Sequence, residues 1–310
     1  MGDRGLPARL KTLEQALIAA GERILRVPPK MMGASRRGER EAGKSDQIDA
    51  RAVARAVLKE GVERFPAAFL DERALEIRLL ADHRSDLVSE RTRQINRLRW
   101  HLVDLCPELE AQIPARRLNS GASLDRIARR LRGEQRTGRV RVALELVASI
   151  RMISRQADEL QRELRSLIMS YRPALLAEQG LGTLTAATLI GRTAGAERFP
   201  TDAHFARQAG VAPIPVSSGR KDRHRLHRGG DRQLNSALHM IALTRARIDP
   251  QTRTYLERKR AEGKSRREAL RCLKRHLARQ VHRLLSMPPT TPEPRTRIQL
   301  NSAISVPCLT

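Results

Sequence analysis

Two carboxylates stand three residues apart at the start of a predicted helix. Ser45 can cap this helix, and Asp46 and Asp49 then lie on one face of its first turn. Two neighbouring carboxylates can hold a hard cation such as magnesium against a phosphate oxygen. Acids in a first turn also complement the helix dipole without binding any metal. The spacing alone therefore leaves a metal site and a simple helix start as alternatives.

A second stretch places two glycines directly before a helix. Gly180 and Gly182, followed by Thr183, lie in a turn that leads into the predicted helix TAATLIGRTAG, which begins at Thr185. Glycines let backbone N–H groups approach a phosphate closely, and the helix start adds partial positive charge. This arrangement resembles a helix-hairpin-helix element, so these three residues are candidate DNA contacts. A Gly-x-Gly turn can equally be a structural corner.

Residues 212–230 are expected to form a loop in which serines precede a glycine among many cations. A serine hydroxyl there can attack a phosphodiester while the cations stabilise the charge that develops at phosphorus. Ser218 is the candidate nucleophile, and the adjacent Ser217 leaves the position open by one residue. A Ser-Gly turn in a solvated loop has the same composition. The cations expected to contact DNA here are Arg220, Lys221, Arg223, Arg225 and Arg228.

The last predicted helix separates apolar from basic positions. Its apolar stripe consists of Leu270, Leu273, Leu277, Val281 and Leu284. Lys274 and Arg275 occupy other faces, where they can follow a phosphate backbone. A solvated basic face on a packed helix gives the same pattern.

The composition supports a polyanionic partner for these stretches. Lys and Arg number 60 against 34 Asp and Glu, which leaves a formal charge of +26. Such an excess favours nucleic-acid binding, although an arginine-rich surface on a very soluble protein gives a similar balance. Three dispersed cysteines suggest neither a zinc site nor a disulfide framework. Without a signal-peptide core or a spanning apolar run, we expect a cytoplasmic protein.

The elements that would position these residues are mainly helices, because Leu, Ala and Arg dominate and aromatics are only 2%. Residues 6–30 predict a helix and a short strand, RILRVP, followed by a basic loop and the helix from Ser45. This alternation indicates part of an α/β domain. Apolar residues at three- and four-residue steps then predict long helices up to residue 105 and over 143–167, typical of a coiled-coil seam. These helices can pair with each other or with a second subunit.

The predicted organisation has four segments. A partial α/β piece covers residues 1–66, and the long helices cover 67–172. A helical domain with the glycine turn and the basic loop covers 173–286. Residues 287–310 are rich in proline, lack an apolar period and are expected to be disordered.

Taken in order, these motifs resemble the DEDD-type insertion-sequence transposases, the IS-one-ten family. Lys44-Ser45-Asp46-x-x-Asp49-Ala50 resembles the end of that family's RuvC-like nuclease domain. Gly180-Leu181-Gly182-x-x-Thr185-Ala186, Ser218-Gly219, and Gly230 with Ala237-Leu238 resemble its C-terminal transposase domain. The resemblance covers roughly residues 6–286 and implies DNA strand cleavage and rejoining, magnesium at Asp46 and Asp49, and Ser218 as nucleophile. It also implies a structured guide RNA and a homo-oligomer as partners.

The first Asp and the Glu of the family's metal set lie on strands that the resemblance places before Leu6. We therefore expect this chain to bind nucleic acid but to be defective in strand transfer. Two other functions remain open: a junction-resolving nuclease that uses metal and water, and a nucleic-acid-binding remnant without turnover. The product formed from DNA distinguishes these functions. A transposase yields joined DNA, a junction nuclease yields hydrolysed DNA, and a binding remnant leaves the DNA uncut.

Overall fold

The computed structural model describes residues 13–14, 16–18, 20–25, 27, 45–65, 71–114, 116–195, 198–218, 221–225 and 227–288. Within these ranges the fold is helical apart from one two-stranded sheet. The expectation of a mainly α protein is therefore confirmed. None of the described helices combines the length and the apolar character needed to cross a membrane.

The N-terminal segment is described in part. Residues 13–14 and 16–18 are helical, and Leu25 forms an isolated bridge where a strand was expected. The basic loop predicted between the strand RILRVP and the helix from Ser45 lies outside the described residues. Helix α3 (Asp46–Glu60) begins as predicted, since the Ser45 hydroxyl accepts a hydrogen bond from the Ile48 N–H at 3.3 Å. The short helix η1 (Val62–Arg64) follows and contacts α3.

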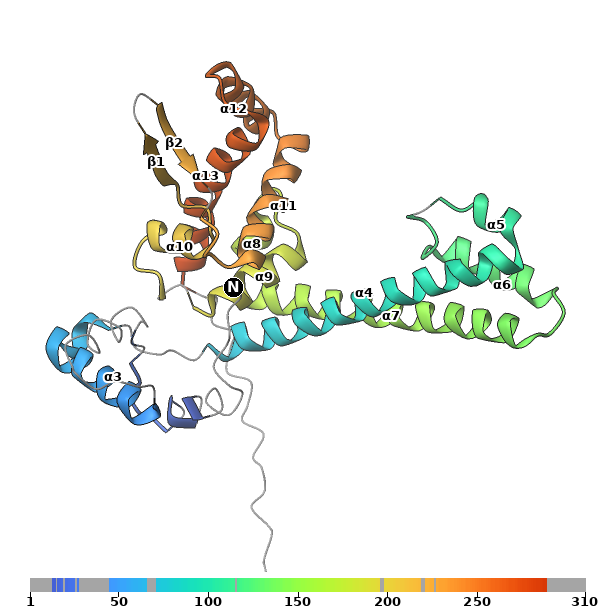
Figure 1. The fold of residues 1–310 in the computed structure, drawn as a ribbon, viewed down its shortest axis with the longest axis horizontal. Coiled ribbons are helices and arrows are strands. Elements are labelled where there is room, and N and C mark those ends of the chain that lie inside the picture. Colours follow the sequence, from blue (N-terminus) through green and yellow to red (C-terminus); the bar gives the residue numbers. More distant parts are fainter. Residues whose placement is uncertain are drawn as a thin grey trace, which may run out of the picture.

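Helices α4 (Glu72–Leu105) and α7 (Gly138–Tyr171) form a long antiparallel pair (Figure 1). Arg84 Nε donates to the Ala157 carbonyl at 3.1 Å, and Arg139 pairs with Asp104 at 2.6 Å. The two predicted apolar runs therefore meet within the chain. Along α7, the predicted seam positions Ala143, Leu146, Ile150, Ile153, Ala157 and Leu164 are buried, while Leu160 and Leu167 are half-buried.

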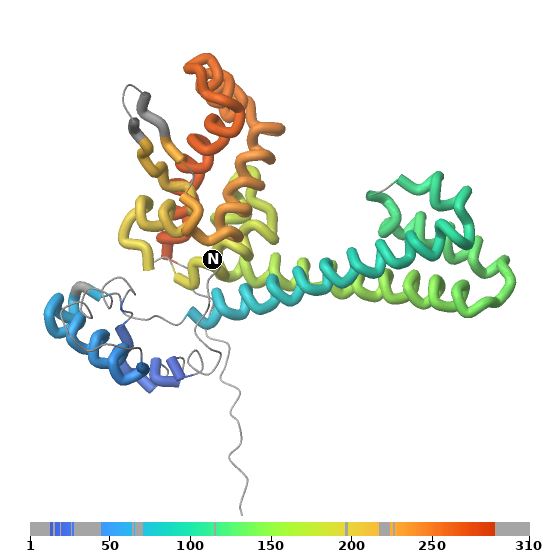
Figure 2. The backbone as a smooth tube through the Cα atoms, in the orientation of Figure 1, coloured from blue at the N-terminus to red at the C-terminus, as the bar shows by residue number. Residues whose placement is uncertain are grey.

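The α4–α7 pair joins two separate hydrophobic cores. At its far end, α5 (Pro107–Ala111) and α6 (Gly121–Arg132) pack on the pair around residues such as Leu102, Ile127 and Ile150. At its base, Ile77 and Ile168 belong to the core of the C-terminal helices. Each long helix is thus fixed at both ends, which gives the pair a defined direction relative to the C-terminal lobe (Figure 2).

The described part of the C-terminal lobe contains six helices: α8 (Pro173–Ala177), α9 (Thr183–Thr193), α10 (Asp202–Gln208), α11 (Arg232–Ile248), α12 (Pro250–Ala261) and α13 (Arg266–Ser286). Helix α9 crosses α4 at very close range at Gly191. A Cβ atom on Gly191 would lie 2.7 Å from the Arg78 Cβ and 2.9 Å from its Cα. Glycine is required there because any side chain would push α4 and α9 apart.

The segment predicted as a basic loop contains two strands, so that prediction was wrong. Strands β1 (Ile214–Ser218) and β2 (Lys221–Arg225) pair antiparallel, in a register that joins Ile214 to Arg225 and Ser218 to Lys221. Pro215 and the many charges hide the alternation by which strands are normally predicted. Because a two-stranded ribbon is marginal alone, its ends must be anchored by the lobe. We call residues 211–229, which contain this ribbon, the arm.

Candidate nucleic-acid interface

The two ends of the arm meet at a pair of glycines. Gly210 has φ +66°, and a Cβ atom on Gly230 would lie 2.3 Å from both the Cα and the N of Gly210. The Asp231 N–H donates to the Gln208 carbonyl at 2.6 Å across the same crossing. Asn235 of α11 completes the anchor, since its Nδ2 donates to the Ala209 and Gly210 carbonyls at 3.0 and 3.1 Å. The base of the arm is therefore tightly clamped.

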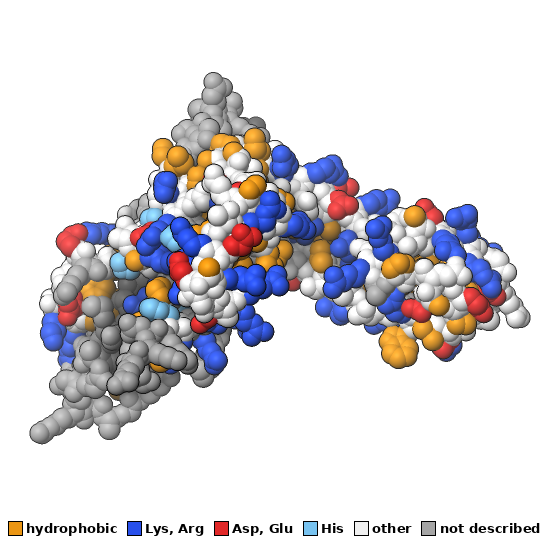
Figure 3. Space-filling model, turned by 90° about the horizontal axis from the view of Figure 1, so that it is seen from above, with side chains coloured by type: hydrophobic (Ala, Val, Ile, Leu, Met, Phe, Trp, Pro, Cys, Tyr) orange, Lys and Arg blue, Asp and Glu red, His pale blue; other side chains and the backbone are white. Residues whose placement is uncertain are grey.

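A groove of about 420 Å³ lies between the arm and α13. Three residues predicted to contact DNA, Arg225, Lys274 and Arg275, line it together although they come from distant parts of the sequence. The other basic side chains that line it are His224, Lys264, Arg271, His276 and Arg279. Figure 3 shows Lys and Arg side chains spread widely over one face of the molecule, including the long extension formed by the α4–α7 pair. The convergence creates a concave surface suited to a phosphate backbone.

One acid also lines the groove, and its role is local. Glu268 forms a capping box with Ser265, whose N–H and hydroxyl both donate to Glu268 Oε2, at 2.9 and 2.7 Å. These hydrogen bonds hold the pKa of Glu268 below its usual value. The carboxylate fixes the start of α13 and offsets only a small part of the positive charge in the groove.

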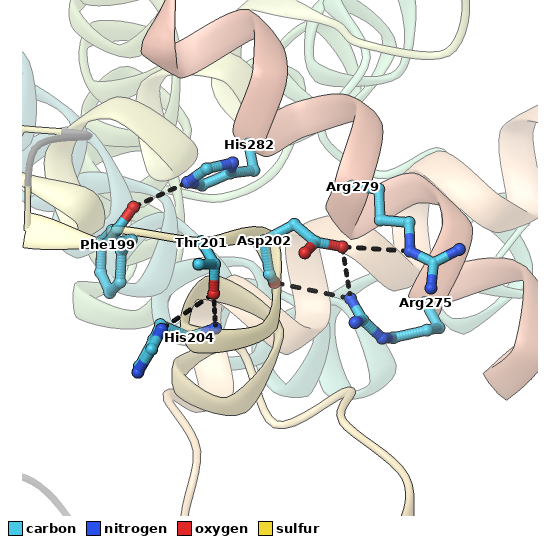
Figure 4. A network of polar contacts seen from close by, with 7 residues as sticks. All are labelled: Phe199, Thr201, Asp202, His204, Arg275, Arg279 and His282. Atoms are coloured by element: carbon cyan, nitrogen blue, oxygen red, sulfur yellow. Dashed lines mark hydrogen bonds and ion pairs between the residues drawn. The ribbon is translucent and has the colours of Figure 1, made fainter.

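Two cations of α13 share a single carboxylate on α10 (Figure 4). Asp202 Oδ2 lies 3.4 Å from Arg275 Nη1 and 3.0 Å from Arg279 Nε. Close by, Thr201 caps α10 through the His204 N–H, and the His282 ring lies 2.9 Å from the Phe199 carbonyl oxygen. Because one negative charge faces two positive ones, this contact orients the guanidinium groups and leaves the pair with net positive charge.

Lys274 was expected on an open helix face and instead lies at 7% exposure on the floor of the groove. Burial, together with the nearby charge of Arg271, lowers its pKa. Its ammonium donates to Asn235 Oδ1 at 2.7 Å, which links the floor of the groove to the anchor of the arm. Lys264 and Asn235 were not predicted as nucleic-acid contacts from the sequence. The helix pattern already placed Arg271 off the apolar stripe, whereas no local signal identifies Asn235.

The remaining predicted contacts on the arm are placed only by their backbone. Ser218 and Lys221 are the last paired residues before the turn of the ribbon, so the candidate nucleophile lies at its tip. Arg220 and the side chains of Ser218, Lys221 and Arg223 lie outside the part that the structure describes. Arg228 is exposed near the base of the arm.

The predicted glycine turn is firmly attached to the lobe. Gly180 has φ +85°, and a Cβ atom there would meet Arg245 Cγ at 3.0 Å. The Arg245 guanidinium donates to the Gln179 carbonyl at 2.7 Å and pairs with Glu178 at 2.6 Å. Packing thus explains Gly180 as a structural corner.

The start of α9 keeps some potential for anion binding. Gly182 is exposed, and a Cβ atom added there would meet no atom within 4 Å, while Thr183 is 8% exposed. No acid occupies the first turn of α9. Neither residue is among those that line the groove in the described part of the chain.

The two candidate metal ligands lie at the start of α3, as expected from their spacing. Asp46 is exposed and Asp49 is half-buried. Their oxygen chemistry fits magnesium, and together they could supply two of the six ligands that this ion requires. Among the described residues, no cluster of three or more His, Cys, Asp or Glu could hold a metal ion.

Two family models match the chain. Residues 173–257 match the model described as "Transposase IS116/IS110/IS902 family", and residues 10–107 match a model described as "Transposase". The first of these contains the glycine turn and the whole arm, and the second contains Asp46 and Asp49.

Three curated relatives are proteins of bacterial insertion elements. The 43.6 kDa protein of insertion element IS110 from Streptomyces coelicolor is 30% identical over 73% of this chain and 67% of its own length. The 42 kDa protein of IS900 from Mycobacterium paratuberculosis is 28% identical over 84% and 75%, respectively. The 44.8 kDa protein of IS116 from Streptomyces clavuligerus is 27% identical over 87% of this chain and 78% of its own length.

A mainly helical fold with a basic groove, together with these matches, defines the class as an insertion-sequence transposase. The chain belongs to the IS116/IS110/IS902 family of transposases.

Proposed function

We propose that this chain cuts and rejoins DNA by means of Ser218 at the tip of the arm, with DNA held in the adjacent basic groove. The observation that carries the proposal is the convergence of Arg225, Lys274 and Arg275 on one concave surface beside the arm. Every Lys or Arg that neutralises a phosphate releases counterions, so this surface favours nucleic acid over neutral ligands.

The proposed chemistry is a pair of phosphoryl transfers. The Ser218 hydroxyl attacks a DNA phosphorus, loses its proton to a base, and displaces one DNA oxygen, which takes up a proton. The resulting phosphoserine ester retains the energy of the broken phosphodiester. The hydroxyl of another strand can therefore attack the phosphorus, displace Ser218 and restore a phosphodiester. Cations of the groove would stabilise the negative charge that develops at phosphorus in both steps.

Asp46 and Asp49 would hold part of a divalent metal site, and we propose magnesium in a RuvC-like domain. When bound, such an ion stabilises negative charge on phosphate oxygens. The contribution of the chain is the rigid start of α3, where the Ser45 cap fixes both carboxylates on one turn.

The proposed partners are DNA, a structured guide RNA from the element, and further copies of the chain. We propose the domain limits 1–66, 67–172 and 173–286, with 287–310 as a tail. The separate cores at the two ends of the α4–α7 pair support a long spacer between functional parts. The exposed Gly182 and the acid-free first turn of α9 support Gly182 and Thr183 as phosphate contacts. The basic sequence of the arm supports further contacts from Arg220, Lys221, Arg223 and Arg228.

The test is a recombination assay on the full chain with element ends, target DNA, the element's transcribed RNA and magnesium. We expect only a weak joined product in the wild type, because Asp46 and Asp49 supply part of a metal site, and its complete loss in the double variant Asp46→Asn and Asp49→Asn. Asp86→Asn, an exposed acid on α4, is the matched control and should recombine normally. Hydrolysed DNA without joining would instead support a junction nuclease, and binding without cleavage would support a non-catalytic remnant.

A further inference from the structure

Lys274 combines deep burial with an incomplete set of partners. Its side chain is part of the floor of the groove, and the residue is 7% exposed. Of the three donors on an ammonium group, one reaches Asn235 Oδ1 at 2.7 Å. Within the described residues this is its one polar contact, and no carboxylate lies within ion-pair distance. Burial of a cation without a counter-charge is costly, so an anion would complete the site.

The surroundings increase the need for an anion. Among the described residues, two titratable groups interact electrostatically with Lys274: Arg271 on the same helix and His239 on α11. Neither supplies negative charge. Burial, and then the charge of Lys274, lowers the pKa of His239. Arg225 and Arg275 line the same groove from the arm and from α13. An entering anion would therefore meet positive charge on several sides.

Asn235 holds the ammonium in a fixed place. Its Nδ2 donates to two main-chain carbonyls at the base of the arm, so its Oδ1 must face Lys274. The ammonium, the Asn235 amide and the Gly210 carbonyl thus form one continuous chain of hydrogen bonds. A group bound at Lys274 would act directly on the anchor of the arm that carries Ser218.

We infer that Lys274 forms a subsite for a single phosphate group of a nucleic-acid backbone, and that Asn235 couples this subsite to the base of the arm. The inference rests on the proposed function, because it takes the occupant of the groove to be nucleic acid. Lys274 would then differ from the surface cations. It would make one buried, directional contact with a phosphate, whereas the surface cations attract the nucleic acid through a field that dissolved salt screens.

The test compares Lys274→Met with Lys264→Met, which removes an exposed lysine from the same groove. Binding of labelled DNA and RNA oligonucleotides is measured by fluorescence anisotropy over a salt series. Lys274→Met should lower affinity about 10- to 100-fold, as for a lost charged hydrogen bond. Lys264→Met should lower it about fivefold or less. Equal effects in the two variants would overturn the subsite.

A structural role for Lys274 needs a separate readout. Urea unfolding should show Lys274→Met to be at least as stable as the wild type, because the variant removes a buried, uncompensated charge. Lys274→Gln keeps a donor for Asn235 without the charge, and it should bind as poorly as Lys274→Met. If Lys274→Gln restores affinity, or if Lys274→Met loses both stability and affinity, the lysine merely supports Asn235 and the inference fails.

Inorganic phosphate distinguishes the source of the ligand. We expect phosphate to raise the melting temperature of the wild type but not of Lys274→Met, and oligonucleotides to compete with it. Phosphate binding without such competition would identify a free-phosphate site and overturn the inference. If wild-type protein binds no nucleic acid at all, the proposed function fails. If wild type and Lys274→Met bind equally, only the subsite fails.

Discussion

Replacement of Gly230 by alanine should release the base of the arm. A Cβ atom there would lie 2.3 Å from two backbone atoms of Gly210 and 2.9 Å from the Gln208 carbonyl oxygen. Since carbon atoms normally pack at about 3.5–4.0 Å, the two strands of backbone must separate by more than about 1 Å. This movement would break the Asp231–Gln208 hydrogen bond and weaken the contact from Asn235.

The loss of folding free energy expected for Gly230→Ala follows from opposing contributions. Overpacking costs about 1–3 kcal/mol, and one broken and one weakened hydrogen bond cost about 1–3 kcal/mol together. Reduced entropy of the unfolded chain returns about 0.4–1 kcal/mol. We therefore expect Gly230→Ala to destabilise the anchored arm by about 3 kcal/mol. The steric and hydrogen-bond losses outweigh the gain in the unfolded state.

The adjacent Gly229 provides the matched control. Its nearest neighbour is the His227 ring at 3.6 Å, which is ordinary contact, and its φ is not positive. Gly229→Ala should accordingly be neutral or stabilising by up to about 1 kcal/mol. Urea unfolding and amide hydrogen exchange over residues 208–235 measure both variants. Equal stability and equal exchange protection in the two variants would refute the close crossing at the base of the arm.

Three further predictions concern the parts that position the groove. Replacing Ile153 and Leu160 together with Asp should put charges into the α4–α7 contact and cost several kcal/mol, on the order of 2–7; unchanged helicity by circular dichroism and unchanged urea unfolding would contradict it. Gly191→Ala should lower the urea midpoint through the α4–α9 crossing, whereas Gly138→Ala, with open space around it, should not; a rise in both midpoints would contradict the close packing. Burial raises the pKa of Tyr171 to about 12, so its contribution to stability is present below its ordinary pKa near 10 and lost as pH rises through about 12. Tyr171→Phe should remove this part of the pH dependence, and identical pH profiles of unfolding free energy would argue against the buried phenol.

Helices α3, α4 and α7 could be predicted because each has a local signal, whereas the region of α5 and α6, with Pro114 and Gly121, was predicted as a loop. Ser45 caps α3, and the apolar steps from Ala143 to Leu167 define the buried face of α7. The choice between pairing within the chain and pairing with another subunit depends on contacts such as Arg84 with Ala157, which are separated by 73 residues. Periodicity along one helix carries no information about its partner.

The candidate site was predicted in its residue types and less well in its geometry. Arg225 and Arg275 were selected and do line one groove, yet the arm that carries Arg225 was expected to be a loop. Lys274 was assigned to an open face because helical spacing alone cannot tell that Asn235 covers it. The Gly210 and Gly230 crossing is likewise a tertiary contact, for which each glycine alone gives only a turn signal.

The central claim is that Ser218, presented by the arm, attacks DNA, and the most direct measurement is a search for the covalent intermediate. The full chain is incubated with labelled element DNA, RNA and magnesium, denatured, and analysed for a protein–DNA adduct by gel and peptide mass spectrometry. We predict an adduct on Ser218 that persists in Ser217→Ala and is absent from Ser218→Ala. An adduct that survives replacement of both serines, or joined DNA formed by the Ser218→Ala protein, would contradict the account.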